Sequence, residues 1–187
     1  MMKQNYKLLS YVNLMDTIPQ NLPNNLKKYF NRLSEYLDTP LYFYGSITRG
    51  DYIPGKSDID IAVFDDNEYS IMAKLQHFLH VKRSNFSKVV WKLNNKMIYG
   101  YKIKCKKHTG IDCEISVYNN YFKDMLLEDY RSGMNPSLTM FVFLYILKFF
   151  YYNIPLLSKQ TYLSIKKKAY DVVSKHENSE FLVLKDN

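Results

Sequence analysis

One short stretch, residues 45 to 64, constrains the fold of this chain more than any other. It begins with Gly45-Ser46, continues through Arg49-Gly50, and ends with Ser57-Asp58-Ile59-Asp60 and four apolar residues. The residues from Ser57 to Phe64 predict a largely buried β-strand, whose two carboxylates lie two positions apart and therefore point to the same face. Carboxylates at the end of an apolar strand persist when they hold a cation, and such a pair suits Mg²⁺.

The turn before this strand has the composition of a phosphate-binding turn. Gly45 lets the backbone approach a ligand closely, and Ser46 adds a hydroxyl to the free backbone N–H groups. Arg49 follows on the same turn and predicts a bidentate contact with a phosphate, or else an ion pair with Asp51 that only holds the turn. Turn and strand together predict a metal-dependent site for a nucleoside triphosphate.

This arrangement resembles the nucleotidyltransferase superfamily built around the DNA polymerase beta palm. The family signature is Gly-Ser, a spacer of roughly ten residues and Asp-x-Asp on a strand, and here eleven residues separate Ser46 from Asp58. The resemblance covers residues 38–118 well. It implies that Asp58 and Asp60 hold Mg²⁺ or Mn²⁺. By its Gly-Ser to Asp-x-Asp segment and its composition, the chain most resembles stand-alone nucleotidyltransferase-like proteins of large DNA viruses.

A site of this kind needs a third carboxylate from a neighbouring strand, as a base or a bridging metal ligand. The strand predicted over residues 111–118 offers two on one face, Asp112 and Glu114. Asp is the usual residue type in the family, which favours Asp112 as the ligand with Glu114 as an accessory acid. The apolar residues after Glu114 suit it equally well, so both stay candidates.

A second group of nucleotide-binding candidates lies near the C-terminus. Lys148 interrupts an aromatic helix, and the poly(A) polymerase and oligoadenylate synthetase branches of the family send such a Lys to the triphosphate. The same resemblance implies that Ser158 and Tyr162 help to bind it. The alternative for Lys148 is an amphipathic side chain that reaches solvent from a core helix.

The order of predicted elements indicates an α+β fold. Helices are expected over 26–37 and 68–80, with strands over 41–44, 57–64, 88–93, 97–105 and 111–118, followed by helices over 121–130, 137–152 and 161–175. This pattern predicts a polymerase beta-like mixed sheet with helices on one face, plus a C-terminal helical lobe. The expected division is a leader at 1–25, a catalytic core at 26–118 and the helical lobe at 119–187.

Charge distribution suggests the class of partner. The formal net charge is +8, and the interval between Glu68 and Asp112 contains basic residues but no acidic ones. A basic surface over Lys82–Lys107 favours RNA or DNA, while a merely solvated Lys-rich surface is the alternative. The longest apolar run is too short to span a membrane, and two cysteines build neither a disulfide framework nor a zinc site, so a cytoplasmic protein is expected, in the host cytoplasm if viral.

These observations predict an enzyme that moves an NMP from an NTP to a hydroxyl acceptor and releases pyrophosphate. The basic surface favours a nucleic-acid 3′ end as the acceptor. The small size of the chain favours a minimal transferase that modifies a protein or a small molecule. A third hypothesis is a non-catalytic module that binds nucleotide or nucleic acid, and it gains support if neither Asp112 nor Glu114 reaches the metal.

Overall fold

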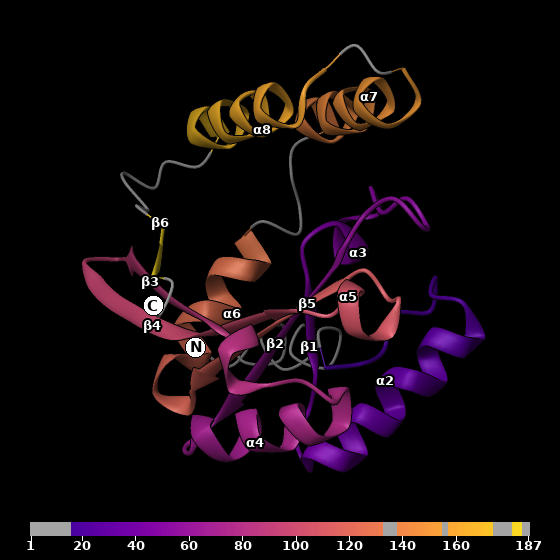
Figure 1. The fold of residues 1–187 in the computed structure, drawn as a ribbon. Helices are drawn as coiled ribbons and strands as arrows, with labels where there is room; N and C mark the ends of the chain where they lie inside the picture. Colours follow the sequence, from indigo (N-terminus) through magenta and orange to yellow (C-terminus); the bar gives the residue numbers. More distant parts are fainter. Residues whose placement is uncertain (1–15, 133–137, 155–156, 174–180, 185–187) are drawn as a thin grey trace, which may run out of the picture.

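The protein is built on one six-stranded mixed sheet. The computed structural model describes residues 16–132, 138–154, 157–173 and 181–184. Helices cover the sheet, and the helices α7 and α8 lie next to each other away from its strands (Figure 1). The structure has the following elements in chain order: α2 (Asn24–Leu37), β1 (Tyr42–Tyr44), α3 (Ser46–Arg49), β2 (Ile59–Asp65), α4 (Glu68–Leu79), η1 (Arg83–Asn85), β3 (Ser87–Leu93), β4 (Lys96–Lys104), α5 (Lys106–Thr109), β5 (Cys113–Asn119), η2 (Asn120–Phe122), α6 (Lys123–Ser132), α7 (Leu138–Asn153), α8 (Lys159–Val173) and β6 (Phe181–Leu184).

The strand order is β1-β2-β5-β4-β3-β6. Strands β2 and β5 run parallel, and all other neighbours are antiparallel. The β2–β5 register places Asp60 opposite Glu114. Because residues in register on adjacent strands share a face of the sheet, these two carboxylates belong to one surface.

Strand alternation separates two cores. On β2, Ile59, Ile61 and Val63 point to the face covered by α2 and α4, where they join a large buried cluster. Ala62 and Phe64 point to the opposite face, where α6 supplies buried leucines. Asp58, just before β2, and Asp60 point to this second face as well. They lie at the start of β2, the end that α6 does not cover.

The helices on the first face begin and end where their local sequence requires. In α4 the Asn67 side chain accepts a hydrogen bond from the Ser70 backbone N–H at 3.1 Å, which satisfies a free donor of the first turn. Helix α2 ends at Leu37. Its C-cap residue, Asp38, has a left-handed backbone conformation and lies two positions before Pro40. Both helices bury apolar residues spaced three or four positions apart.

The structure confirms the expected α+β fold, with each predicted helix and strand present and its ends shifted by a few residues. Strand β6 was not predicted, because four apolar residues in isolation do not distinguish a strand from a helix. Residues 1–15 of the expected leader lie outside the described residues. Among the described helices, none is long and apolar enough to cross a membrane.

Candidate active site

Asp58, just before β2, and Asp60 on β2 line a pocket between the sheet and the C-terminal helices. Its volume is about 340 Å³. Walls from α7 and α8 face the start of β2 and the turn between β1 and α3, so distant parts of the chain build one site. The residues lining it are Tyr44, Gly45, Ser46, Arg49, Ser57, Asp58, Asp60, Lys148, Tyr152, Tyr162, Leu163 and Lys166.

Asp60 carries a perturbed carboxyl group. Burial raises its pKa to about 7, and repulsion from Asp58 and Glu114 adds to the shift, while Lys166 and Lys102 act in the opposite direction. The nearby cations therefore do not fully offset the negative charge gathered here. A bound cation would offset it, because an opposite charge a few ångströms away favours the ionised carboxylate.

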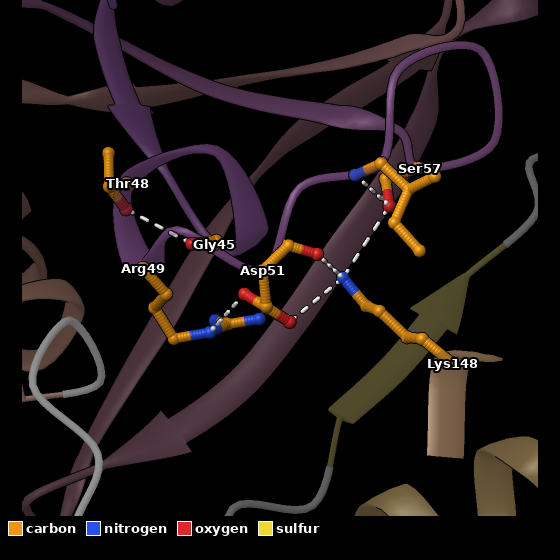
Figure 2. Close-up of polar contacts among 7 residues, drawn as sticks. Gly45, Thr48, Arg49, Asp51, Ser57 and Lys148 are labelled. Atoms are coloured by element: carbon orange, nitrogen blue, oxygen red, sulfur yellow. Dashed lines mark hydrogen bonds and ion pairs between the residues drawn. The ribbon is translucent and has the colours of Figure 1, made fainter. Parts of the chain in front are cut away.

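The turn before α3 is shaped around Asp60. Gly45 has φ +74°, and a Cβ atom at this position would overlap the Asp60 carboxylate, so a side chain is excluded on two grounds. The Thr48 hydroxyl donates a hydrogen bond to the Gly45 carbonyl at 3.0 Å and holds the turn (Figure 2). Within the described part of the chain, the buried Ser46 hydroxyl has no hydrogen-bond partner. A buried hydroxyl without a partner at a pocket wall fits a ligand oxygen.

The Lys148 side chain extends from α7 to Asp51 in the loop after α3. Its Nζ lies 2.8 Å from both the carbonyl and the Oδ2 of Asp51, and 3.5 Å from the Ser57 hydroxyl (Figure 2). Arg49 donates from Nε to Asp51 Oδ1 at 3.2 Å. Arg49 therefore makes the ion pair with Asp51 that the sequence allowed, and Lys148 is buried rather than extended to solvent. Contact of either side chain with a phosphate stays a prediction.

The pKa values of this buried pair shift together. Burial lowers the pKa of Lys148, and the Asp51 carboxylate counteracts part of that shift. Burial acts to raise the pKa of Asp51, but the adjacent Arg49 and Lys148 outweigh it and hold this pKa below its ordinary value. Asp51 is thus a buried, ionised carboxylate that depends on two cations.

The two candidates for the third carboxylate occupy different positions. Glu114 lies in register with Asp60, and its carboxylate pairs with Lys102 at 2.8 Å and with Lys104 at 3.6 Å. Asp112 precedes β5, and its carboxylate pairs with Lys106. The geometry favours Glu114 over Asp112 as the partner of Asp60, whereas the family resemblance favoured Asp112.

The candidates on α8 also separate. The Tyr162 side chain lines the pocket and stacks on Tyr151, with ring centroids 4.3 Å apart. The Ser158 hydroxyl lies 2.8 Å from the Thr161 hydroxyl and accepts a hydrogen bond from the Thr161 N–H at 3.1 Å, so it caps the first turn of α8.

Tyr152 and Lys166 also line the pocket, although they were not among the candidates from the sequence. The spacing of Lys166 was a usable signal, because a residue four positions after Tyr162 lies on the same face of a helix. Tyr152 follows Lys148 by the same interval.

The donor set fits a metal held jointly by protein and substrate. Among the described residues, no group of three or more His, Cys, Asp or Glu side chains is arranged to hold a metal ion. Mg²⁺ needs only one or two carboxylates when substrate phosphates complete its coordination. Asp58 and Asp60 share a pocket wall and meet that requirement, and burial, with repulsion from Asp58 and Glu114 in addition, raises the pKa of Asp60 at the same place.

The expected basic surface is partly neutralised in three dimensions. Lys102 and Lys104 pair with Glu114, and Lys106 pairs with Asp112. Glu114 and Asp112 follow the basic stretch in sequence. Glu114 lies on β5, the strand that pairs with β4, and Asp112 lies just before β5. The run between Glu68 and Asp112 therefore presents less free positive charge than its composition suggests.

Comparison with known proteins identifies the family. A family model described as a nucleotidyltransferase domain matches residues 24–130, more than half of the chain. The chain belongs to the nucleotidyltransferase domain family. The match includes the Gly45-Ser46 turn, Asp58 and Asp60, and the whole of β5. The polymerase beta-like fold expected for this nucleotidyltransferase-family chain is confirmed.

Several solved structures are similar to this nucleotidyltransferase-family chain at low identity. The Cid1 poly(U) polymerase is 18% identical, with 65% of this chain and 38% of that one covered and a TM-score of 0.38. A cytoplasmic RNA terminal U-transferase is 20% identical, with the same coverages and TM-score. Terminal uridylyl transferase 4 from Trypanosoma brucei is 15% identical, with 68% and 44% covered and a TM-score of 0.33. The chain spans about two fifths of the length of these proteins. No curated protein matches the sequence significantly.

Proposed function

We propose that this chain is a metal-dependent nucleotidyltransferase that moves an NMP from an NTP to a hydroxyl acceptor and releases pyrophosphate. One observation carries the proposal. The carboxylates of Asp58 and Asp60 share a pocket of about 340 Å³ with the Gly45-Ser46 turn and with two lysines from the C-terminal helices. A triphosphate with its metal requires acidic groups that hold the cation, a turn that binds phosphate, and positive charge opposite both.

The residues of the pocket divide the work of binding. Ser46 offers a phosphate oxygen its hydroxyl, which has no hydrogen-bond partner among the described residues, and the absent side chain of Gly45 leaves room beside Asp60. Asp58 and Asp60 would hold Mg²⁺ or Mn²⁺. The metal supplies stabilisation of the negative charge that develops on the reacting phosphate. Lys166 and Tyr162 bring a cation and an aromatic ring from α8.

The transfer forms one bond and breaks one. The acceptor oxygen bonds to the α-phosphorus, the bond from that phosphorus to the bridging oxygen breaks, and pyrophosphate leaves with the electron pair. A carboxylate takes the proton of the acceptor hydroxyl. Glu114 is our candidate for this base, because it is in register with Asp60 and only partly exposed. In this assignment residues 26–118 carry the catalytic residues; within 119–187, α7 and α8 form the helical lobe beside the pocket, whereas α6 packs on the sheet and β6 pairs with β3.

The acceptor is the least constrained part of the proposal. A nucleic-acid 3′ end is still favoured by the net charge of +8, although the pairing of Lys102, Lys104 and Lys106 with acids weakens that argument. A protein or small-molecule acceptor is the alternative. The structures compared above do not test the resemblance to proteins of large DNA viruses, which stays a prediction.

A second candidate function is a nucleotide-binding module without catalysis. The observation that favours it is the ion pairing of both candidate third carboxylates, Glu114 with Lys102 and Asp112 with Lys106. If these pairs persist with NTP bound, no free carboxylate reaches the acceptor. Such a protein would bind Mg²⁺ and NTP through Asp58, Asp60 and Ser46 but would not turn over.

The deciding experiment offers labelled NTPs with Mg²⁺ or Mn²⁺ to RNA, DNA and protein acceptors in parallel. Asp60→Asn is the test variant, and Asp66→Asn, an exposed acid just after the same strand, is the matched control. Calorimetric NTP binding is measured on the same samples. Transfer by the wild type and by Asp66→Asn but not by Asp60→Asn supports the enzyme. NTP binding without transfer supports the binding module, and neither binding nor transfer overturns both.

A further inference from the structure

Helix α7 is apolar on the side that faces away from the pocket. Its inner side buries Met140, Leu144, Leu147 and Lys148. Its outer side leaves large apolar residues exposed, from 39% for Phe150 to 78% for Leu138. A helix that is apolar all round is ordinarily covered on all sides. Five of the exposed residues, called the α7 stripe below, are Leu138, Val142, Tyr145, Ile146 and Phe149.

The α7 stripe is large enough for a specific interface. An aromatic side chain covers 150–250 Å² when fully buried, so half-exposed residues of this size leave on the order of 100 Å² each. The stripe thus exposes about 500 Å², and two such surfaces pressed together bury about 1,000 Å² in total, where specific interfaces begin. Phe143 and Phe150 flank the stripe and are also exposed, which enlarges this area.

The spacing of the stripe suits a helix of the same kind. Leu138, Val142, Tyr145 and Phe149 are separated by four, three and four positions, the alternation that keeps a seam in contact with a second helix. The only charged residue of α7 is Lys148, which is buried on the inner side and bound to Asp51. An uncharged seam selects an uncharged partner surface, and a second copy of the seam has that property.

We propose that the α7 stripe seats a second copy of this chain, with α7 against α7 across a twofold axis. In such an isologous contact the centre of the seam, at Tyr145 and Ile146, faces its own copy. Lys148 and Tyr152 on the same helix line the candidate active site, so the dimer braces the wall of the pocket from outside. The inference rests on the shape and chemistry of α7 and not on the proposed function.

The test is the mass of the full chain in solution. Sedimentation velocity and light scattering between about 1 and 100 µM should show a dimer that dissociates on dilution, in the affinity range of modest interfaces. Val142→Glu and Phe149→Glu should each raise the dissociation constant at least ~100-fold, since both copies then bring a charge into the seam. Met97→Glu, which charges an exposed apolar residue of β4, is the matched control and should remain dimeric. Circular dichroism confirms that each variant is folded.

A mixing experiment tests the twofold arrangement. Tyr145→Glu and Tyr145→Lys chains should each be monomeric alone and should associate when mixed, because the opposite charges meet at the centre of the seam. A wild-type chain that stays monomeric at about 100 µM overturns the proposal. Flotation with anionic vesicles that Val142→Glu abolishes, in an otherwise monomeric chain, also overturns it and assigns the stripe to a membrane surface.

Discussion

Replacement of Lys148 by methionine tests the buried ion pair between α7 and Asp51 in the loop after α3. Methionine keeps most of the length and apolar surface of the side chain but removes its charge. The Lys148 side chain is 4% exposed and that of Asp51 is 1% exposed, so the variant leaves a buried carboxylate with one cation instead of two. The loss of one partner from a buried ion pair costs about 3–5 kcal/mol of the free energy of unfolding.

The remaining partner of Asp51 sets the expected value. Arg49 still lies 3.2 Å from Asp51 Oδ1, so we expect the lower end of that range, about 3 kcal/mol. For a chain of this size, 1 kcal/mol corresponds to about 2–4 °C in Tm, which predicts a fall of roughly 6–12 °C. Thermal and urea unfolding measure it. Lys168→Met, at an exposed position of α8, is the control and should change stability by no more than about 0.5 kcal/mol.

The double variant Asp51→Asn/Lys148→Met tests the cause. If the cost comes from the uncompensated carboxylate, the double variant should be less destabilised than the sum of the two single variants, by about 0.5–3 kcal/mol. Additive effects, or a fall of less than about 1 kcal/mol in Lys148→Met, would refute the view that this ion pair holds the two parts together. NTP affinity measured on the same variants shows whether Lys148 also serves the triphosphate.

Four further outcomes are expected. Asp60→Asn should reduce transfer by at least ~10²-fold, measured with labelled NTP, because the chemistry is almost wholly electrostatic. The pKa of Asp60 is raised to about 7, so in metal-free protein the folded state keeps this proton to a higher pH than the unfolded state does. The stability of the wild type relative to Asp60→Asn should therefore fall as pH rises from about 4 to 7. A Tm difference between the two proteins that does not change over this range contradicts the argument. Glu114→Gln should match the loss of activity in Asp60→Asn, whereas Asp112→Asn should stay within a few-fold of wild type; the reverse result would restore Asp112 as the third carboxylate. Ser46→Ala should weaken NTP binding, measured by calorimetry, without loss of Tm, because this hydroxyl has no hydrogen-bond partner in the described part of the protein.

The local features of this protein could be predicted from the sequence because each has a short-range cause. Alternation along β2 put Ile59 and Ile61 on one face and Asp58 and Asp60 on the other, which a two-residue period requires. Gly45 was predicted to let the backbone approach a ligand, which stays a prediction, and the structure shows in addition the Asp60 carboxylate where a Cβ atom would lie. The helices followed from apolar spacing together with capping and turn residues.

Apart from the local Arg49–Asp51 pair, which the sequence allowed, the ionic partners in the site were decided by tertiary structure. Lys148 and Asp51 are 97 positions apart in sequence and meet only because α7 packs over the loop after α3. Glu114, rather than Asp112, stands beside Asp60 because of the β2–β5 register, and a shift of two residues would be needed to place Asp112 there. The pairing of β4 with β5 brings Glu114 to Lys102, and Asp112, just before β5, meets Lys106 of α5, so a surface that looks basic in sequence is partly neutralised. A sequence shows which side chains carry charge, but the contacts that oppose or release that charge depend on strand pairing and helix packing over long range, for which the local pattern carries no signal.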